Sequence, residues 1–248
     1  MMRIRMLAAR VALLTLLLPP AAAYAQAPTA PQETAPPATT EQQPAEPAPD
    51  ASAQPSSDDP AQPTPDAWQV INWVIATHDN HDMPFMVVDK VAARVFLYDS
   101  SGEPIGAAPA LFGMTAGDEA TPGVGDRELS NIPPKDRKTP AGRFVAKFGR
   151  AAGGRDVLWV DYPSAISLHA VITSIKKQHR LERLNSPTPE DNRVTYGCIN
   201  VPTKFYADIV KPTFKRTSGI VYVLPETKPL NEVFLAMPPA APVPQAAR

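Results

Sequence analysis

Thr195-Tyr196-Gly197-Cys198-Ile199-Asn200 is the stretch around which the folded part of the chain is organised. It holds the only cysteine of the sequence and runs into Pro202, which suits the first position of a helix because its missing N–H costs no hydrogen bond there. A thiol just before a helix N-terminus lies near the positive end of the helix dipole, which favours the thiolate. Gly197 allows a sharp turn, and the Cys198 N–H could face a developing oxyanion.

A single cysteine cannot form a disulfide within its own chain, whereas exported domains that use disulfides carry even numbers of cysteines. Cys198 is therefore either an inert buried thiol or a reactive one. Composition alone favours the inert thiol. Its place after Gly197 and before a predicted helix reverses that preference.

A cysteine nucleophile usually needs a neighbouring base, and the chain has four histidines. His169 lies in the middle of a predicted strand, 166–171, where an imidazole has a fixed place. His78 and His81 lie in a polar run after the first predicted helix, where a solvated turn is favoured over a metal site. His179 lies in a basic loop and is typical of a solvated face. His169 is the best candidate for the base.

The first 25 residues predict a secretory signal peptide. Three arginines accompany a short apolar core, residues 11–18, and Ala23-Tyr24-Ala25 supplies the small residues of a cleavage site. The apolar run is far shorter than the roughly 20 residues of a membrane-spanning helix. We therefore expect export across the inner membrane to the periplasm, with no stable membrane span after cleavage.

The charge balance argues against a nucleic-acid partner. The chain has 24 Lys and Arg against 25 Asp and Glu, and the predicted signal peptide contains three of the arginines. The mature chain is therefore mildly acidic, without the basic surface that tracks phosphates.

Composition divides the rest of the chain. Residues 26–65 are rich in Pro, Ala, Thr, Gln and Ser, with too few large apolar side chains to offset the cost of ordering, and predict a disordered linker. Residues 237–248 predict a similar tail. One folded domain, 66–236, remains, which is a common domain size.

The domain is predicted to be mainly β. A first helix, capped by Thr64 or Asp66, is followed by a hairpin of strands 86–89 and 94–98. A second helix is expected after Asn200. Further strands are expected at 144–148, 157–162, 166–171 and 220–224. Two long irregular segments, 114–140 and 174–193, are either binding loops or surface decoration.

In their order, these motifs resemble the L,D-transpeptidase family with the YkuD-type catalytic domain. That family has a strand histidine, here His169, and later Ser/Thr-His-Gly-Cys followed by a hydrophobic residue and Asn or Arg. Lys138-Thr139-Pro140-Ala141-Gly142-Arg143-Phe144 looks like its Thr-Pro-x-Gly-x-Phe signature. The opening hairpin is also similar, so the resemblance covers about residues 85–224.

The resemblance implies a β-sandwich or barrel with a helix after the catalytic cysteine. Cys198 would attack the carbonyl of the third residue of a peptidoglycan stem peptide, expel the terminal D-alanine and form a thioester. His169 would be the general base, oriented by the backbone carbonyl of Ala170, and an amine of a second stem would resolve the thioester. Neither a metal nor an organic cofactor is implied.

The chain departs from the family pattern in two places. Tyr196 replaces the histidine before Gly197 and cannot act as an imidazole acid or base, although it can donate a hydrogen bond. The loop between His169 and Thr195 is also longer than usual. Exported proteobacterial relatives share this longer loop, a Gly-Asp-Arg segment like 125–127, and a Tyr/Ala-Gly-Cys-Ile-Asn-Val ending.

Several residues are candidates for substrate binding. Thr195 and Asn200 belong to the motif, while Arg193 and Arg127 could receive stem-peptide carboxylates, with a solvated surface as the alternative for each arginine. The same alternative holds for the basic residues of the long loop, which are Lys176, Lys177, Arg180 and Arg183.

Three functions remain open on the sequence. The first is an L,D-transpeptidase that cross-links or anchors at the cell wall. The second keeps the acyl-enzyme and uses water as the acceptor, as an L,D-carboxypeptidase or endopeptidase. The third is a catalytically silent wall-binding module. The pattern of Cys198 with His169 favours the enzymes, and the lack of ligand spacing disfavours a metal hydrolase.

Overall fold

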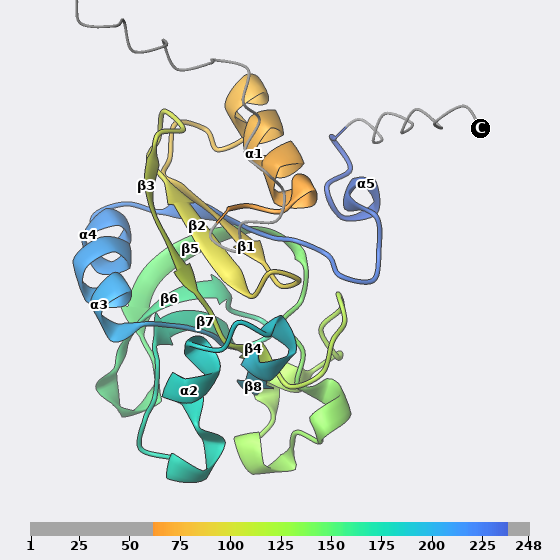
Figure 1. Cartoon of the computed structure of the whole chain (residues 1–248), viewed down its shortest axis with the longest axis vertical. Coiled ribbons are helices and arrows are strands. Elements are labelled where there is room, and N and C mark those ends of the chain that lie inside the picture. Colours follow the sequence, from red (N-terminus) through yellow and green to blue (C-terminus); the bar gives the residue numbers. More distant parts are fainter. Residues whose placement is uncertain (1–61, 238–248) are drawn as a thin grey trace, which may run out of the picture. The chain divides into compact units, whose positions relative to one another are not determined.

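The computed structural model describes residues 62–237 (Figure 1). The predicted signal peptide, almost all of the predicted linker and all but the first residue of the predicted tail lie outside these residues. Among the described residues, no helix is long and apolar enough to cross a membrane.

The described part of the chain is built mainly of strands. These are β1 (Phe85–Asp89), β2 (Arg94–Tyr98), β3 (Pro104–Pro109), β4 (Phe112–Gly113), β5 (Gly142–Arg150), β6 (Asp156–Asp161), β7 (Ile166–Ala170), β8 (Arg193–Thr195), β9 (Ile199–Val201) and β10 (Gly219–Val223). The helices are α1 (Pro65–Thr77), α2 (Arg180–Leu184), α3 (Thr203–Phe205), α4 (Lys211–Phe214) and α5 (Leu230–Val233), with a π-helical turn, Tyr206–Val210, between α3 and α4. Short 3₁₀ turns, η1–η6, lie in the connections.

Eight strands form one sheet in the order β3-β2-β1-β10-β5-β6-β7-β9, and β4 pairs with β8. The two ends of the large sheet approach each other, because Leu111, just after β3, exchanges two backbone hydrogen bonds of 2.8 and 3.0 Å with Asn200 of β9. The sheet is therefore nearly closed. The mainly β prediction is confirmed, and this bridge favours a barrel over an open sandwich.

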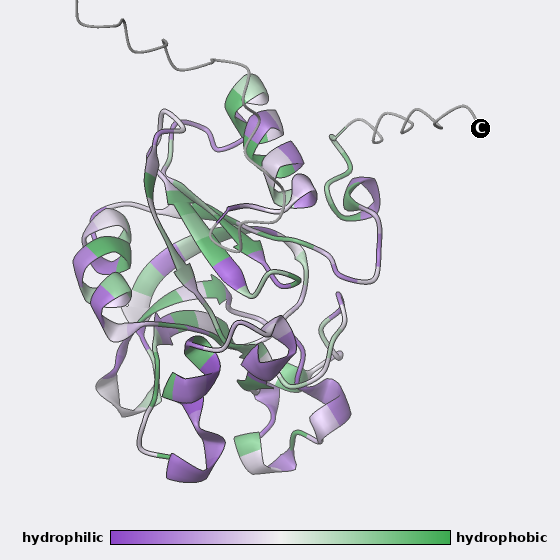
Figure 2. Cartoon of the chain, viewed as in Figure 1, coloured by the Kyte–Doolittle hydropathy of each residue, from purple (hydrophilic) through white to green (hydrophobic). Residues whose placement is uncertain are grey.

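Both faces of the central strands are covered. Along β1, Met86 and Val88 pack into a core that α3 and α4 close, while Phe85 and Val87 pack outward against α1 and α5. This explains why β1 reads as a continuous apolar run instead of an alternating one. In Figure 2 the central strands are largely hydrophobic, whereas many of the connections are hydrophilic.

Thr64 caps α1, as one of the two predicted candidates. Its hydroxyl accepts from the Ala67 N–H at 3.2 Å and donates to Asp89 Oδ2 at 2.6 Å. A cap of this kind satisfies one of the free N–H groups at a helix start. Here it also ties the helix to the β1–β2 turn.

The structure corrects the region after the cysteine. Pro202 is the N-cap of α3 and not its first helical residue. The residues before it, Ile199–Val201, form β9 and pair in parallel with β7. This strand is only three residues long, so no alternation in the sequence could reveal it. The edge strand β3 is longer, but it begins and ends with proline, which disfavours a strand prediction.

A buried lysine joins three distant segments. Lys90 has no exposed side-chain surface, and its Nζ lies 2.9 Å from Asp118 Oδ1, 2.9 Å from Thr139 O and 3.3 Å from Glu226 Oε1. Burial alone would raise the pKa of Asp118, but hydrogen bonds from Thr227, Lys90 and the backbone of Glu226 outweigh it and lower that pKa to about 2.

Replacing Lys90 with methionine is expected to lower the free energy of unfolding by about 3 kcal/mol, because breaking a buried ion pair leaves its carboxylates uncompensated. The loss lies at the low end of the usual range since Asp118 keeps its other donors. Urea unfolding at neutral pH measures it. The control is Lys228→Met, which removes an exposed ion pair with Glu119 and should leave the unfolding midpoint almost unchanged, because solvent screens such a pair. Equal losses in the two variants would contradict the prediction.

Candidate active site

The register of β7 and β9 brings the motif residues together. His169 is paired with Asn200 and Leu168 with Ile199, and side chains two residues apart on a strand share a face. His169 therefore shares one face with Asn200 and Cys198. On the same face Ser167 Oγ lies 3.6 Å from Cys198 Sγ. Cys198, the residue just before β9, therefore lies diagonally across from His169 of β7.

The turn before Cys198 is fixed by two threonine hydroxyls. Thr195 Oγ1 donates to Cys198 O at 2.7 Å and accepts from Gly197 N at 3.1 Å. Thr139 Oγ1 donates to Gly197 O at 2.7 Å and accepts from Gly113 N at 2.9 Å. Thr195 is buried, so its hydroxyl is used inside the turn. The Thr-Pro signature predicted from the sequence thus lies against the cysteine turn.

Gly197 has no room for a side chain. Its φ is +128°, and a Cβ there would lie 2.5 Å from Lys138 O and 2.6 Å from Ile166 Cδ1. A backbone oxygen cannot move aside as a flexible side chain can. The glycine of the motif is therefore required by packing as well as by conformation.

Gly197→Ala is expected to destabilise the fold, because backbone strain and overpacking each cost about 1–3 kcal/mol. Thermal unfolding of the variant measures the loss. Gly123→Ala is the matched control, since Gly123 also has a positive φ, +70°, but has open space around its Cβ position. It should show the conformational cost alone. A Gly197 variant no less stable than the Gly123 variant would show that the predicted clash is absent.

His169 is held as a neutral imidazole. Nδ1 lies 2.8 Å from Ala170 O, the contact that the resemblance implies. The side chain is buried, and desolvation lowers its pKa below 6.5. The hydrogen bond to Ala170 opposes that shift, while the positive charges of Arg155 and Arg180 add to it. The ring is therefore unprotonated at neutral pH and able to accept a proton.

Arg180 enters the site from the long loop between β7 and β8. It is 7% exposed, and its Nη1 donates to Asn200 Oδ1 at 2.7 Å. Asn200 Nδ2 in turn lies 3.3 Å from His169 Nε2. Of the two alternatives for the basic loop residues, the solvated surface does not hold for Arg180, although Lys176 and Lys177 are exposed. The sequence offers no local signal that sets Arg180 apart from its basic neighbours.

The expected source of thiolate stabilisation is also wrong. Because β9 separates Cys198 from α3, the thiol does not lie at a helix N-terminus, and the dipole falls off within the first turn. A different positive group is close instead. Coulomb attraction to Cys198 raises the pKa of Arg180 against the larger, lowering effect of its burial.

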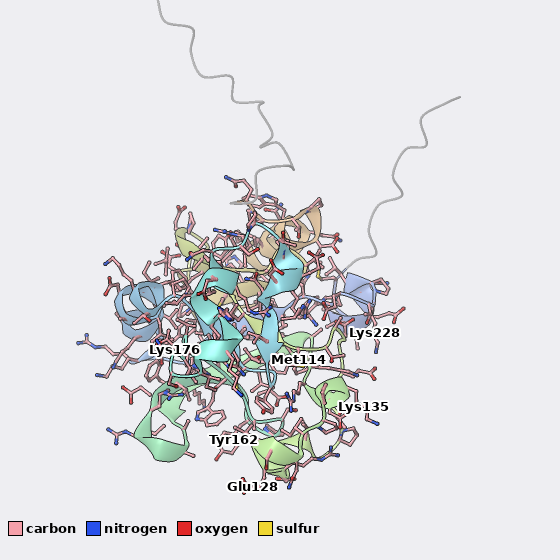
Figure 3. All side chains as sticks on the ribbon, turned by 60° about the horizontal axis from the view of Figure 1, so that its bottom comes forward. Met114, Glu128, Lys135, Tyr162, Lys176 and Lys228 are labelled. Atoms are coloured by element: carbon pink, nitrogen blue, oxygen red, sulfur yellow. The ribbon has the colours of Figure 1, made fainter. Side chains whose placement is uncertain are left out.

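Three connections border the cysteine. The 114–140 segment contributes Arg137, whose guanidinium carbon lies 4.0 Å from the centroid of the Tyr196 ring. Ala165, after β6, places its carbonyl oxygen 3.7 Å from Cys198 Sγ. The third connection carries Arg180. Figure 3 views this end of the molecule, with Met114, Tyr162 and Lys176 marking the three connections. The thiol between them is partly accessible.

The two other predicted arginines are engaged elsewhere. Arg193 pairs with Glu226, the carboxylate that also contacts Lys90. Arg127 pairs with Asp136 at 3.0 Å within its own segment. Within residues 62–237 neither guanidinium has a hydrogen bond or ion pair to Cys198, His169 or Asn200. Their role in binding carboxylates stays a prediction.

The remaining histidines do not form a metal site within the described chain, where no group of three or more His, Cys, Asp or Glu side chains could hold an ion. Asp79, between His78 and His81, accepts instead from Arg143 and, at 2.6 Å, from Tyr222. The polar run after α1 is thus a structural turn. His179 lies 3.5 Å from exposed Glu182.

The sequence matches no protein-family model and no curated protein. Similar solved structures include an LD transpeptidase in complex with imipenem, with 17% identity, a TM-score of 0.34, and coverage of 57% of this chain and 58% of that one. An L,D-transpeptidase from Xylanimonas cellulosilytica has 12% identity, a TM-score of 0.35, and coverage of 57% and 60%. A fused Zn-dependent amidase/peptidase/peptidoglycan-binding domain-containing protein from Clostridium acetobutylicum has 14% identity, a TM-score of 0.34, and coverage of 66% and 64%. The chain spans about three fifths of the length of these proteins.

Proposed function

We propose that this chain is a cysteine-dependent acyltransferase of the L,D-transpeptidase type. It acts on peptidoglycan stem peptides through a thioester, in cross-linking or anchoring at the cell wall, after export to the periplasm. One observation carries the proposal: Cys198, just before β9, lies on the same face as His169 of β7, and His169 Nδ1 lies 2.8 Å from Ala170 O. This is the nucleophile, base and orienting group that thiol acyl transfer needs.

The chemistry follows from these roles. His169 Nε2 takes the thiol proton while Cys198 Sγ bonds to the carbonyl carbon of the third stem residue. The carbonyl oxygen becomes an oxyanion, for which the Cys198 N–H is the nearby backbone donor. Collapse of this intermediate breaks the bond to D-alanine, whose amine receives the proton from His169. A thioester and free D-alanine remain.

The second half of the reaction regenerates the thiol. The side-chain amine of another stem attacks the thioester, His169 takes a proton from that amine, and the carbon–sulfur bond breaks. The products are an amide cross-link and Cys198 with its proton restored. Water in place of the amine would give a shortened stem. The three connections around the thiol determine which acceptor reaches it.

Product analysis tests the proposal. The mature chain is incubated with purified tetrapeptide stems, and products are identified by mass. We expect cross-linked dimers with release of D-alanine. Tripeptides alone would identify a hydrolase and reject the transferase. No product and no adduct with a carbapenem, which typically acylates cysteines of this family, would reject the enzyme and leave a wall-binding module.

A further inference from the structure

Arg180 has no role in the chemistry described so far, although it is buried beside the site. We propose that Arg180 is a positioning residue that acts through Asn200 to fix the tautomer of His169. The proposal deepens the proposed function and rests on it for the role of His169 as a base. It assigns a function to the long loop between β7 and β8, which carries Arg180.

The first step concerns the orientation of the Asn200 amide. A guanidinium has only N–H donors and no acceptor. Arg180 Nη1 lies 2.7 Å from the Asn200 side chain, so the amide must turn its oxygen toward the arginine. Its NH₂ group then faces the other way, 3.3 Å from His169 Nε2. Because Asn200 is completely buried, water cannot replace either partner.

The second step concerns the imidazole. Since the Asn200 NH₂ is a donor, His169 Nε2 must be the acceptor and carries no proton. A neutral ring has one N–H, which is then on Nδ1. Nδ1 faces Ala170 O at 2.8 Å, and a carbonyl can only accept. The contacts at the two ends of the ring therefore require the same tautomer.

The third step concerns the charge of the ring. A doubly protonated imidazole would place its Nε2–H against the Asn200 NH₂, with two donors face to face. The charged groups around His169 work in the same direction, because Arg180 and Arg155 are both positive. The other titratable neighbour is the Cys198 thiol. The arrangement keeps Nε2 unprotonated. Because Nε2 has a single lone pair, the thiol proton must displace the 3.3 Å contact from Asn200, which is the longer of the two contacts of the ring.

The loop is held in place by a different arginine. Arg183 Nε donates to Gln178 O at 3.0 Å, and its Nη1 donates to Asp191 O at 2.6 Å. Arg183 thus ties the loop to itself. Arg180 donates from Nε to Gln178 Oε1 at 2.7 Å within the loop, but its Nη1 reaches across to Asn200. This separation allows a positioning role to be distinguished from a structural one.

The test is ¹⁵N NMR of the full chain labelled at histidine, with the His169→Gln spectrum identifying the signals of His169. We expect a proton-bearing Nδ1 and an unprotonated Nε2 at neutral pH. Arg180→Lys keeps a donor-only side chain and should keep this pattern. Arg180→Gln can also accept, which lets the amide turn its oxygen toward Nε2. Because Ala170 O still accepts from Nδ1, a ring protonated at both nitrogens should then appear beside the neutral form. Arg183→Gln is the control and should leave the tautomer unchanged.

Asn200→Asp should have the opposite effect on the protonation of His169 to that of the native asparagine. Its carboxylate would accept from both Arg180 and His169, so Nε2 should gain a proton and the ring should become an imidazolium that titrates at higher pH. Alkylation of Cys198 by iodoacetamide provides a rate for each variant. The rate should fall in Arg180→Gln, by less than the roughly 10²-fold or more that loss of the base itself would cost, and it should be rescued in Arg180→Lys.

A protonated Nε2 in the unmodified chain would overturn the proposal. An Nε2 that stays unprotonated, together with an unchanged alkylation rate, in Arg180→Gln would do the same by leaving Arg180 only a packing role. If Arg180→Gln does not fold, the spectra of Arg180→Lys and Asn200→Asp decide. None of these readouts needs a peptidoglycan substrate. Failure of stem-peptide acylation with the predicted tautomer present would therefore reject the proposed function and not the positioning role.

Discussion

Cys198→Ala is expected to abolish acylation completely, with no thioester on stem peptides and no covalent adduct with a carbapenem. The sulfur is the only thiol in the sequence, and no other group in the site can form a thioester. Intact-protein mass spectrometry after incubation measures the adduct. A mass shift that persists in the variant would place the acylated residue elsewhere, with Ser167, 3.6 Å from the sulfur, as the first to test.

The same variant should keep its fold. The thiol is partly exposed, and its contacts with Ser167 and Ala165 are long, at 3.6 and 3.7 Å. We therefore expect the free energy of unfolding to change by less than about 1 kcal/mol. Binding to isolated cell wall should persist for the same reason. Loss of binding together with loss of the fold would mean that the activity result says nothing about the nucleophile.

Much of the fold was predictable from local patterns. The hairpin β1–β2 and the strands β5, β6, β7 and β10 each carry enough apolar residues to be recognised within a few positions. The motif around Cys198 and the strand position of His169 also indicated the two central residues of the site. These features depend on neighbours in the sequence, or on the order of short motifs.

The arrangement around β9 was not predictable in this way. Whether Ile199–Val201 forms a strand is decided by its pairing with β7 and by the Leu111 bridge. Both partners are distant in the sequence. The expectation that Cys198 lies at a helix N-terminus was wrong, because this pairing places a strand between the cysteine and the helix. The orientation of the cysteine is thus a property of the closed sheet.

The buried charged residues Lys90, Asp118 and Arg180 were also not predictable from their local sequence. Lys90 and Asp118 are 28 positions apart, and the sequence around each is typical of a surface turn. Arg180 belongs to a run of basic residues whose other members are mostly exposed. It begins α2 directly after His179, which has a positive φ of 47°. The composition of the loop predicts that its basic residues are exposed, and it does not indicate that Arg180 alone is buried in the site.

His169→Gln is expected to lower the rate of Cys198 acylation about 10²–10⁴-fold, the usual contribution of a general base. Glutamine has a similar length and can still donate to Ala170 O, so the variant removes the base with little change in packing. Steady-state kinetics with stem peptide, or with a carbapenem, measures the rate. His179→Gln is the matched control, because His179 is exposed and lies on the long loop away from the paired strands. Equal rates in the two variants would exclude His169 as the base.

The role of His169 also predicts how the acylation rate and the stability depend on pH. Because burial lowers the pKa of His169 below 6.5, its neutral form persists into mildly acidic solution, and the acid limb of kcat/KM should have its midpoint below 6.5. The same shift contributes to stability, since the unfolded chain binds the proton at a higher pH than the folded one. That contribution is present above about pH 6.5 and is lost as the pH falls through the folded value. In His169→Gln both the acid limb and this loss of stability should disappear, whereas a limb that remains would have to be assigned to another group.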